Sequence, residues 1–185
     1  MQILERSKDE VISKAETMSD FLKMEYLEKC SERFSDSLIL QYCYSELVRL
    51  YQGRVMYSDA LKYLAKLQSL TISPKEKLHL YEKEIELFIK SGQYDHVIGS
   101  YKEAIKLTNE LGELELRRKV IQFFKDEAIK LERSKKYAAL TKLYERLIIW
   151  LTDMEKNEFK KKLFEIYKKL GKVRESIELE KKIHW

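Results

Sequence analysis

Three histidines and two cysteines carry the side chains that most often hold metals or act as nucleophiles, but their spacing fits neither role. His79, His96 and His184 stand far apart, and His96 has only Asp95 beside it at the start of an expected helix. Cys30 and Cys43 lie 13 residues apart without a CxxC pair. The sequence also lacks a glycine-rich phosphate loop, a nucleophile elbow and an HExxH helix. It therefore predicts a protein that is not an enzyme and that holds no cofactor or metal.

Clusters of basic residues in the second half of the chain could recognise phosphate groups. Residues 113–185 contain 20 Lys and Arg against 13 Asp and Glu, a net charge of +7, in a chain of net charge +5. Glutamates such as Glu127, Glu158 and Glu165 interleave with the basic residues, often at helical pair spacing, so an ion-paired, solvated surface is the favoured interpretation. Nucleic-acid association through this basic C-terminal half is the alternative. The clusters are Arg117–Lys119, Arg133 with Lys135 and Lys136, Lys160–Lys162, and Lys168 and Lys169 with Lys172 and Arg174.

The elements that would position any functional side chain are expected to be helices. Hydrophobic residues make up 44% and charged residues 36% of the 185 residues, with only 5 Gly and 1 Pro. Such a composition is poor in turn formers and rich in residues that favour helices. No apolar run is long enough to span a membrane, and the N-terminal MQILERSKDE lacks the apolar core of a signal peptide. We therefore expect an all-α protein in the cytoplasm.

A repeated helical stripe organises the sequence. In its clearest copy, which follows Gly92, the residues Tyr94, Val97, Tyr101 and Ala104 are spaced by 3, 4 and 3 and so share one helix face. Large and small residues alternate along this stripe, which favours close packing against a neighbouring helix. Four copies occur at spacings of 37, 43 and 36 residues, and their first residues are Tyr57, Tyr94, Tyr137 and Val173.

Each copy is preceded by a second apolar helix pattern, so the repeating element is a helical hairpin. Ser73 and Pro74 suit the N-cap and first position of a helix. The 43-residue spacing predicts a longer helix or an extra turn around 109–112. The turns before the four copies are expected to be opened by Gly53, Gly92, Ser134-Lys135-Lys136 and Gly171. The whole chain, 1–185, is predicted to be a single solenoid with hairpins at 1–38 (a degenerate copy), 41–70, 75–108, 118–150 and 156–185.

The segment Gly92–Ala104 resembles the second helix of a tetratricopeptide repeat, and Tyr81, Ile85 and Phe88 resemble its first helix. The long spacings are similar to those of the longer variety found in soluble attachment proteins of the membrane-fusion machinery. The resemblance implies a right-handed α-solenoid of about five antiparallel hairpins with a concave groove. It also implies a non-catalytic scaffold or adaptor for protein–protein interaction, which binds a peptide or helix in that groove. An adaptor in membrane fusion or vesicle traffic is a weaker alternative.

The resemblance further implies which side chains line the groove, because outward positions of each first helix do so in tetratricopeptide proteins. No matching pair carries the Lys and Asn of the carboxylate clamp that grips acidic chaperone tails, so an adaptor for such tails is not expected. The implied positions include both acidic and basic side chains, which suit a peptide or helix that carries both charges. The alternative is that these side chains form only a solvated face. The implied positions are Tyr42, Ser45, Arg49, His79, Glu82, Glu86, Lys90, Gln122, Lys125, Ile129 and Arg133, followed by Lys161, Glu165 and Lys168.

The last helix has no successor to pack against. Ile177, Ile183 and Trp185 are therefore expected to be partly exposed. Repeat arrays usually end in a polar cap, so this end predicts self-association through the C-terminal helix or the docking of a partner helix. The alternative is a terminal helix that only packs its inner face inward.

Overall fold

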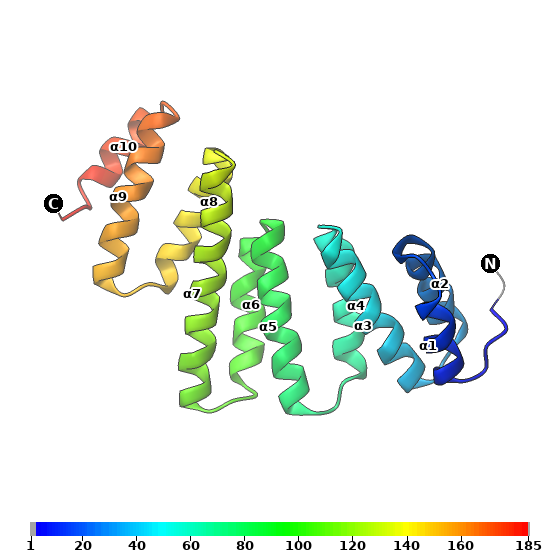
Figure 1. Ribbon diagram of the computed structural model, residues 1–185. Coiled ribbons are helices and arrows are strands. Elements are labelled where there is room, and N and C mark those ends of the chain that lie inside the picture. The colour runs from blue at the N-terminus through cyan, green and yellow to red at the C-terminus, as the bar shows by residue number, and fades with distance from the viewer. Residues whose placement is uncertain (1–2, 185) are drawn as a thin grey trace. The chain divides into compact units, whose positions relative to one another are not determined.

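The computed structural model describes residues 3–184 and is helical without strands over that range (Figure 1). This confirms the predicted all-α class, and the helices follow one another as TPR-like hairpins. The α-helices are α1 Lys8–Glu16, α2 Asp20–Arg33, α3 Ser37–Gly53, α4 Tyr57–Leu70, α5 Pro74–Ser91, α6 Tyr94–Ile105, α7 Glu110–Arg133, α8 Tyr137–Leu147, α9 Asp153–Lys169 and α10 Val173–Glu180. A short 3-10 helix, η1 Ile148–Trp150, follows α8.

Capping side chains set where several helices begin. The Asp36 carboxylate accepts hydrogen bonds from two amides of the first turn of α3, and the Asn109 side chain accepts one from the first turn of α7. Thr152 opens α9 with a capping box. Pro74 is the first residue of α5 and Ser73 precedes it, as predicted. The long predicted spacing is accommodated by α7, which runs for 24 residues.

The chain divides into two compact units that meet between Ser91 and Gly92. In the first, called unit 1, α1 pairs with α2 and α3 with α4, and α5 packs against α4. In the second, unit 2, α6 contacts α7, α7 pairs with α8, and α9 pairs with α10. The predicted hairpin at 75–108 crosses the boundary, so its pairing and the single continuous solenoid stay predictions.

An aromatic cluster around one carboxylate joins three helices of unit 1. The rings of Tyr51 on α3 and Tyr63 on α4 stack with centroids 5.6 Å apart, and Tyr44 lies 6.0 Å from Tyr63. Both the Tyr51 and the Tyr63 hydroxyls donate to Oε1 of Glu28 on α2, at 2.6 and 2.8 Å. The rings bury apolar area while the carboxylate satisfies their hydroxyls. The two hairpins of unit 1 are therefore joined by packing and by hydrogen bonds.

Tyrosine–glutamate bonds recur in unit 2. Tyr144 of α8 donates its hydroxyl to Glu132 of α7, and Tyr167 of α9 donates to Glu145 of α8 at 2.7 Å. Tyr144 also meets the ring of Phe159 edge-on at 5.3 Å. These contacts connect α7, α8 and α9 in sequence. The repeated stripes that the sequence predicts for α4, α6 and α8 are buried or half-buried along their length.

The residue two places before each stripe adopts a left-handed backbone conformation. Gly92 and Gly171 do so at φ 76° and 68°, but Val55 and Lys135 do so as well, at 63° and 54°. After Val55, Lys135 and Gly171, the next amide donates back to a carbonyl of the preceding helix, as in a Schellman motif. In the first of these turns, the Met56 amide donates to the Tyr51 carbonyl at 2.9 Å. Gly53, the residue expected to open this first turn, is instead the last residue of α3. That expectation was wrong because the turn lies nearer the next helix, where the sequence places a valine.

At the C-terminal end of unit 2, one of the side chains predicted to be exposed is buried. Ile177 is 49% exposed as expected, whereas Ile183 is only 6% exposed. The side chain of Asn157 on α9 donates to the His184 carbonyl at 2.5 Å and accepts from the His184 amide at 2.9 Å. These two bonds hold the segment after α10 against α9 and bury Ile183, which corrects its expected exposure. Trp185 lies outside the described residues.

Candidate functional site

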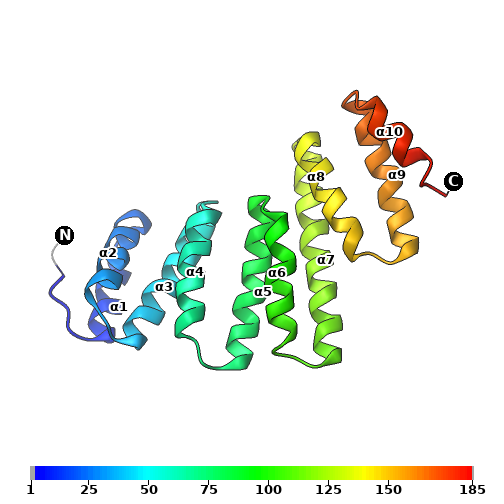
Figure 2. The same ribbon diagram turned by 180° about the vertical axis from the view of Figure 1, so that it is seen from behind.

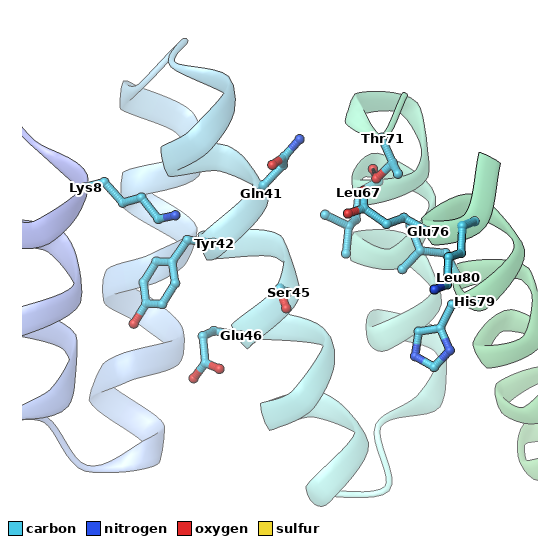
Figure 3. Close-up of a pocket in the computed structure, with 11 residues that line it drawn as sticks. Lys8, Gln41, Tyr42, Ser45, Glu46, Leu67, Thr71, Glu76, His79 and Leu80 are labelled. Carbon is cyan, nitrogen blue, oxygen red and sulfur yellow. Dashed lines mark hydrogen bonds between the residues drawn. The ribbon is translucent and has the colours of Figure 1, made fainter. Parts of the chain in front are cut away.

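A groove in unit 1 brings together side chains from consecutive first helices, α3 and α5 (Figure 3). Its volume is about 730 Å³. Three of the predicted residues line it: Tyr42 and Ser45 from α3 and His79 from α5. Figure 3 shows Tyr42 and Ser45 on the α3 side of the groove and His79 on the α5 side, since α4 packs against both of these helices. The pairing of these positions is what the tetratricopeptide-like resemblance implies.

The floor of the groove is apolar. Leu67 near the end of α4 and Leu80 of α5 line it and are half-buried. The polar side chains beside them are already satisfied: Gln41 donates to the Leu70 carbonyl at 3.2 Å, and Thr71 donates to the Leu67 carbonyl at 2.9 Å. An apolar group entering the groove would therefore meet hydrocarbon without stripping polar groups of partners.

One wall of the groove carries a carboxylate that is held by two cations. The Glu46 carboxylate forms ion pairs with the Lys23 ammonium of α2 at 2.9 Å and with the Arg49 guanidinium at 3.0 Å. Burial of Glu46 opposes its ionisation, but the hydrogen bonds from Arg49 and Lys23 outweigh burial and lower the pKa of the carboxyl group. Arg49, a predicted groove residue, is thus engaged in a pair on its own helix and does not line the groove.

Tyr42, which lines the groove, has a neutral hydroxyl at physiological pH. Burial, followed by the neighbouring charge of Glu46, raises the pKa of Tyr42 to about 12. A neutral phenol both donates and accepts hydrogen bonds. It can therefore bind a backbone amide or a carbonyl of a partner.

The rim of the groove carries charges that no described residue neutralises. Lys8 of α1 and Lys75 of α5 line the groove, are exposed, and form no ion pair within residues 3–184. Glu76 lies beside Lys75 and is exposed as well. His79 approaches Glu82, with its Nδ1 3.9 Å from the carboxylate. The charges of Lys8, Lys75 and Glu76 at the rim therefore sum to a net positive charge.

The remaining predicted residues of α5 form an internal network. Glu86 pairs with Lys83 at 2.9 Å and with Lys90, one turn further along. Burial raises the pKa of Glu86, but hydrogen bonds from Lys90 and Lys83 more than offset this and lower it. Glu86 and Lys90 therefore stabilise the helix surface as an i,i+4 pair, and neither lines the groove of unit 1.

In unit 2 a smaller cavity of about 290 Å³ lies at the equivalent place, among α7, α8 and α9. It contains two predicted residues, Lys125 and Ile129, while Gln122 donates to Asp126 at 2.7 Å and Arg133 is exposed outside it. Lys125 pairs with Glu155 of α9 at 3.2 Å, so its charge is neutralised. The later positions Lys161, Glu165 and Lys168 do not line it.

Sequence reasoning missed the groove residues that are not outward positions of a first helix. Leu67 and Thr71 belong to the end of α4, and Leu80 looks like an ordinary core residue of α5. Glu46 could have been found, because its spacing of three from Arg49 is typical of a helical ion pair. The apolar floor could not, since its exposure depends on how far apart α3 and α5 stand.

The described residues offer no group of three or more metal-ligating side chains. Cys30 and Cys43 are free thiols, both fully buried in unit 1. Across residues 3–184, none of the helices combines the length and apolarity that crossing a bilayer requires.

The hairpins described above define an all-helical, TPR-like repeat protein. No protein-family model and no curated protein matches the sequence. Among solved structures, the chain is similar to a Podosopora anserina putative kinesin light chain with nearly identical TPR-like repeats, at 12% identity and a TM-score of 0.43, over 94% of this chain and 90% of that one. A second crystal structure of the same repeats gives 12% identity and a TM-score of 0.44, over 95% and 90%. BtubC (BKLC) from P. vanneervenii gives 14% and 0.36, over 95% and 71%. At these scores the similarity carries no conclusion about function.

Proposed function

We propose that the protein is a non-catalytic interaction module that binds a peptide or helix of a partner protein in the groove of unit 1. The observation that carries this proposal is the convergence of Tyr42, Ser45 and His79, from consecutive first helices, on one groove with an apolar floor. A groove of this size and composition suits an amphipathic segment, which places apolar side chains inward and polar ones at the rim.

The chemistry of the groove defines the partner more closely. One apolar side chain of the partner would rest on Leu67 and Leu80. An acidic residue beside it would meet Lys8 or Lys75, the rim cations without ion pairs in the described residues. Tyr42 would bind the partner's backbone. An adaptor function follows from such a site, whereas a role in membrane fusion or vesicle traffic has no support in the groove itself.

The cavity of unit 2 gives little support to the alternative that the protein binds nucleic acid. Lys125 is paired with Glu155, and Lys162 with Glu158 at 2.9 Å. The same holds on α7, where Lys130 pairs with Glu127 at 3.2 Å. Paired lysines attract phosphate weakly, so these interleaved charges favour the ion-paired surface over a nucleic-acid site.

A peptide selection tests the proposal. Random peptides displayed on phage are selected against the purified protein, and the affinity of each enriched peptide is measured by fluorescence anisotropy. Ser45→Arg places a long side chain in the groove, and we expect it to weaken binding at least about tenfold because one apolar anchor is worth roughly 1.5 kcal/mol or more. Ser58→Arg is the matched control, since Ser58 is exposed on α4 outside the groove.

The enriched peptides are expected to share an apolar residue next to an acidic one. If peptides are enriched but bind the Ser45→Arg variant and the wild type equally, the groove is not the binding site. If none is enriched above the level of an unrelated helical protein, the proposed function is wrong.

A further inference from the structure

One end of unit 2 concentrates exposed basic side chains from two turns. The turn from α7 to α8 and the turn from α9 to α10 lie at the same end of their hairpins, as both views show (Figures 1 and 2). The Lys169 ammonium lies 5.3 Å from the centre of the Tyr137 ring and so connects the end of α9 to the start of α8. We call this surface the basic edge. It comprises Arg133, Lys135, Lys136, Lys168, Lys169, Lys172 and Arg174, all of them exposed.

The basic edge differs from the rest of unit 2 in having few carboxylates beside its basic side chains. The segments 133–138 and 168–174 contain no Asp or Glu. The nearest acidic groups along the chain are Glu132, which binds the Tyr144 hydroxyl, and Glu175, whose carboxylate stands 3.9 Å from the Lys172 ammonium. Elsewhere in the unit, lysines and arginines pair at closer range, as Arg146 does with Asp95 at 2.5 Å.

Several of these cations lie over aromatic rings. The ammonium of Lys168 lies 4.1 Å from the centre of the Phe164 ring, and that of Lys172 lies 5.4 Å from the centre of the Tyr167 ring. Contact with a neutral ring does not cancel the positive charge. The basic edge therefore presents a standing positive potential.

Aliphatic side chains are exposed within the same edge. Val173 is 65% exposed and Leu170 is 37% exposed, and they flank Gly171 and Lys172 in the turn. The aromatic rings of the edge are less available: Tyr137 is half-buried beneath Lys169, and Tyr167 is 7% exposed. The edge thus offers positive charge and aliphatic surface, with no open aromatic face among these described residues.

We propose that the basic edge binds the surface of an anionic lipid membrane. Lysine and arginine attract anionic head groups, and each such side chain near the surface raises the partition coefficient by roughly fivefold. Exposed aliphatic side chains gain further free energy by entering the boundary between head groups and acyl chains. Single-stranded nucleic acid would instead call for exposed aromatic rings on which bases stack. This inference concerns unit 2 and is independent of the groove of unit 1.

Vesicle co-sedimentation of the full chain tests the inference. The protein is mixed with vesicles of phosphatidylcholine alone or of phosphatidylcholine and phosphatidylserine, at low and moderate salt. We expect binding to the mixed vesicles only, weaker at the higher salt because exposed charges are screened. Removal of three charges by Lys135→Gln, Lys136→Gln and Arg174→Gln should lower the partition coefficient about a hundredfold.

Matched control variants distinguish binding through the basic edge from a general effect of net charge or of exposed apolar side chains. Lys102→Gln, Lys106→Gln and Arg118→Gln remove the same net charge from exposed positions outside the two turns of the edge and should leave binding nearly unchanged. Val173→Ser should weaken binding about tenfold, whereas Met154→Ser should not, since Met154 is 88% exposed at the opposite end of α9.

Three results would overturn the inference. The first is equal binding to neutral and anionic vesicles. The second is equal loss of binding in the edge variant and its charge control. The third is binding of a single-stranded RNA, or of a poly-glutamate peptide, that depends on the edge residues while the vesicles are not bound. Circular dichroism of every variant verifies that the helices remain folded.

Discussion

Tyr63 donates its hydroxyl hydrogen to the Glu28 carboxylate across 2.8 Å, and this bond joins the second helix of one hairpin, α2, to the second helix of the next, α4. Tyr51 of α3 donates to the same oxygen at 2.6 Å. A single half-buried acid thus satisfies two phenols, which are only 8% and 5% exposed. Loss of that acid would leave both hydroxyls without a partner in a region that water reaches poorly.

Glu28→Ala should lower the free energy of unfolding by about 2–3 kcal/mol, because two buried donors lose their acceptor. Tyr63→Phe should cost only about 1 kcal/mol, since Glu28 keeps its bond from Tyr51. Urea denaturation followed by circular dichroism measures both changes. Glu25→Ala is the control: its carboxylate is 46% exposed and pairs with Lys29 on the same helix, so only a small change is expected. Equal effects of Glu28→Ala and Glu25→Ala would contradict a role for the shared acceptor.

The buried tyrosines predict a loss of stability in alkali. Burial and the hydrogen bond to a carboxylate raise the pKa of Tyr51, Tyr63, Tyr144 and Tyr167 above the ordinary value for tyrosine. Above about pH 10 the unfolded chain therefore releases phenolic protons that the folded chain retains, and folding becomes less favourable. The slope approaches about 1.4 kcal/mol per pH unit for each such tyrosine. Urea midpoints at several pH values measure it, and Tyr63→Phe should make the decline shallower.

Val55→Gly should stabilise unit 1 by about 1 kcal/mol, because a β-branched residue incurs a steric penalty at positive φ that glycine does not. Gly171→Val should have the opposite sign for the same reason; a Cβ at Gly171 would meet no atom within 4 Å, so the cost is purely conformational. Gly53→Ala, in a helical position, should be neutral or slightly stabilising. Thermal unfolding compares the three variants, and destabilisation by Val55→Gly would refute the assignment of strain to this turn.

Asn157→Ala should loosen the segment that follows α10, since both bonds to His184 are lost and only the bond from Lys160 to the Lys182 carbonyl remains. The buried side chain of Ile183 would then become exposed, and the unfolding free energy should fall by about 1–2 kcal/mol. Hydrogen exchange measured by mass spectrometry should show faster exchange in the peptide containing residues 181–184. Asn109→Ala, which removes a cap from α7 in the same unit, should leave exchange in that peptide unchanged.

The helices could be predicted from the sequence because their signals are local. The stripes beginning at Tyr57, Tyr94 and Tyr137 depend only on spacing within one helix, and each of these residues is the first of a helix. The turn residues were harder to assign, because positive φ is indicated mainly by glycine and, less strongly, by asparagine or aspartate. Val55 and Lys135 adopt it without any such signal.

The candidate site could be predicted only in part. Tyr42, Ser45 and His79 were accessible to sequence reasoning, since outward positions of a first helix follow from periodicity and from the resemblance. The pairing of Arg49 with Glu46, which removes Arg49 from the groove, depends on rotamers and on the approach of Lys23 from another helix. The burial of Ile183 likewise depends on Asn157, which lies 26 positions earlier.

Because Cys30 and Cys43 are completely buried, the rate at which their thiols are labelled measures how often unit 1 opens. A thiol reagent can reach either sulfur only when that unit unfolds, so the labelling rate reports its opening under native conditions. Unit 2 contains no cysteine but holds Trp150, which is 9% exposed and becomes the sole tryptophan after Trp185→Phe. Labelling and fluorescence, followed in one sample, would therefore tell whether the two units open together or one at a time.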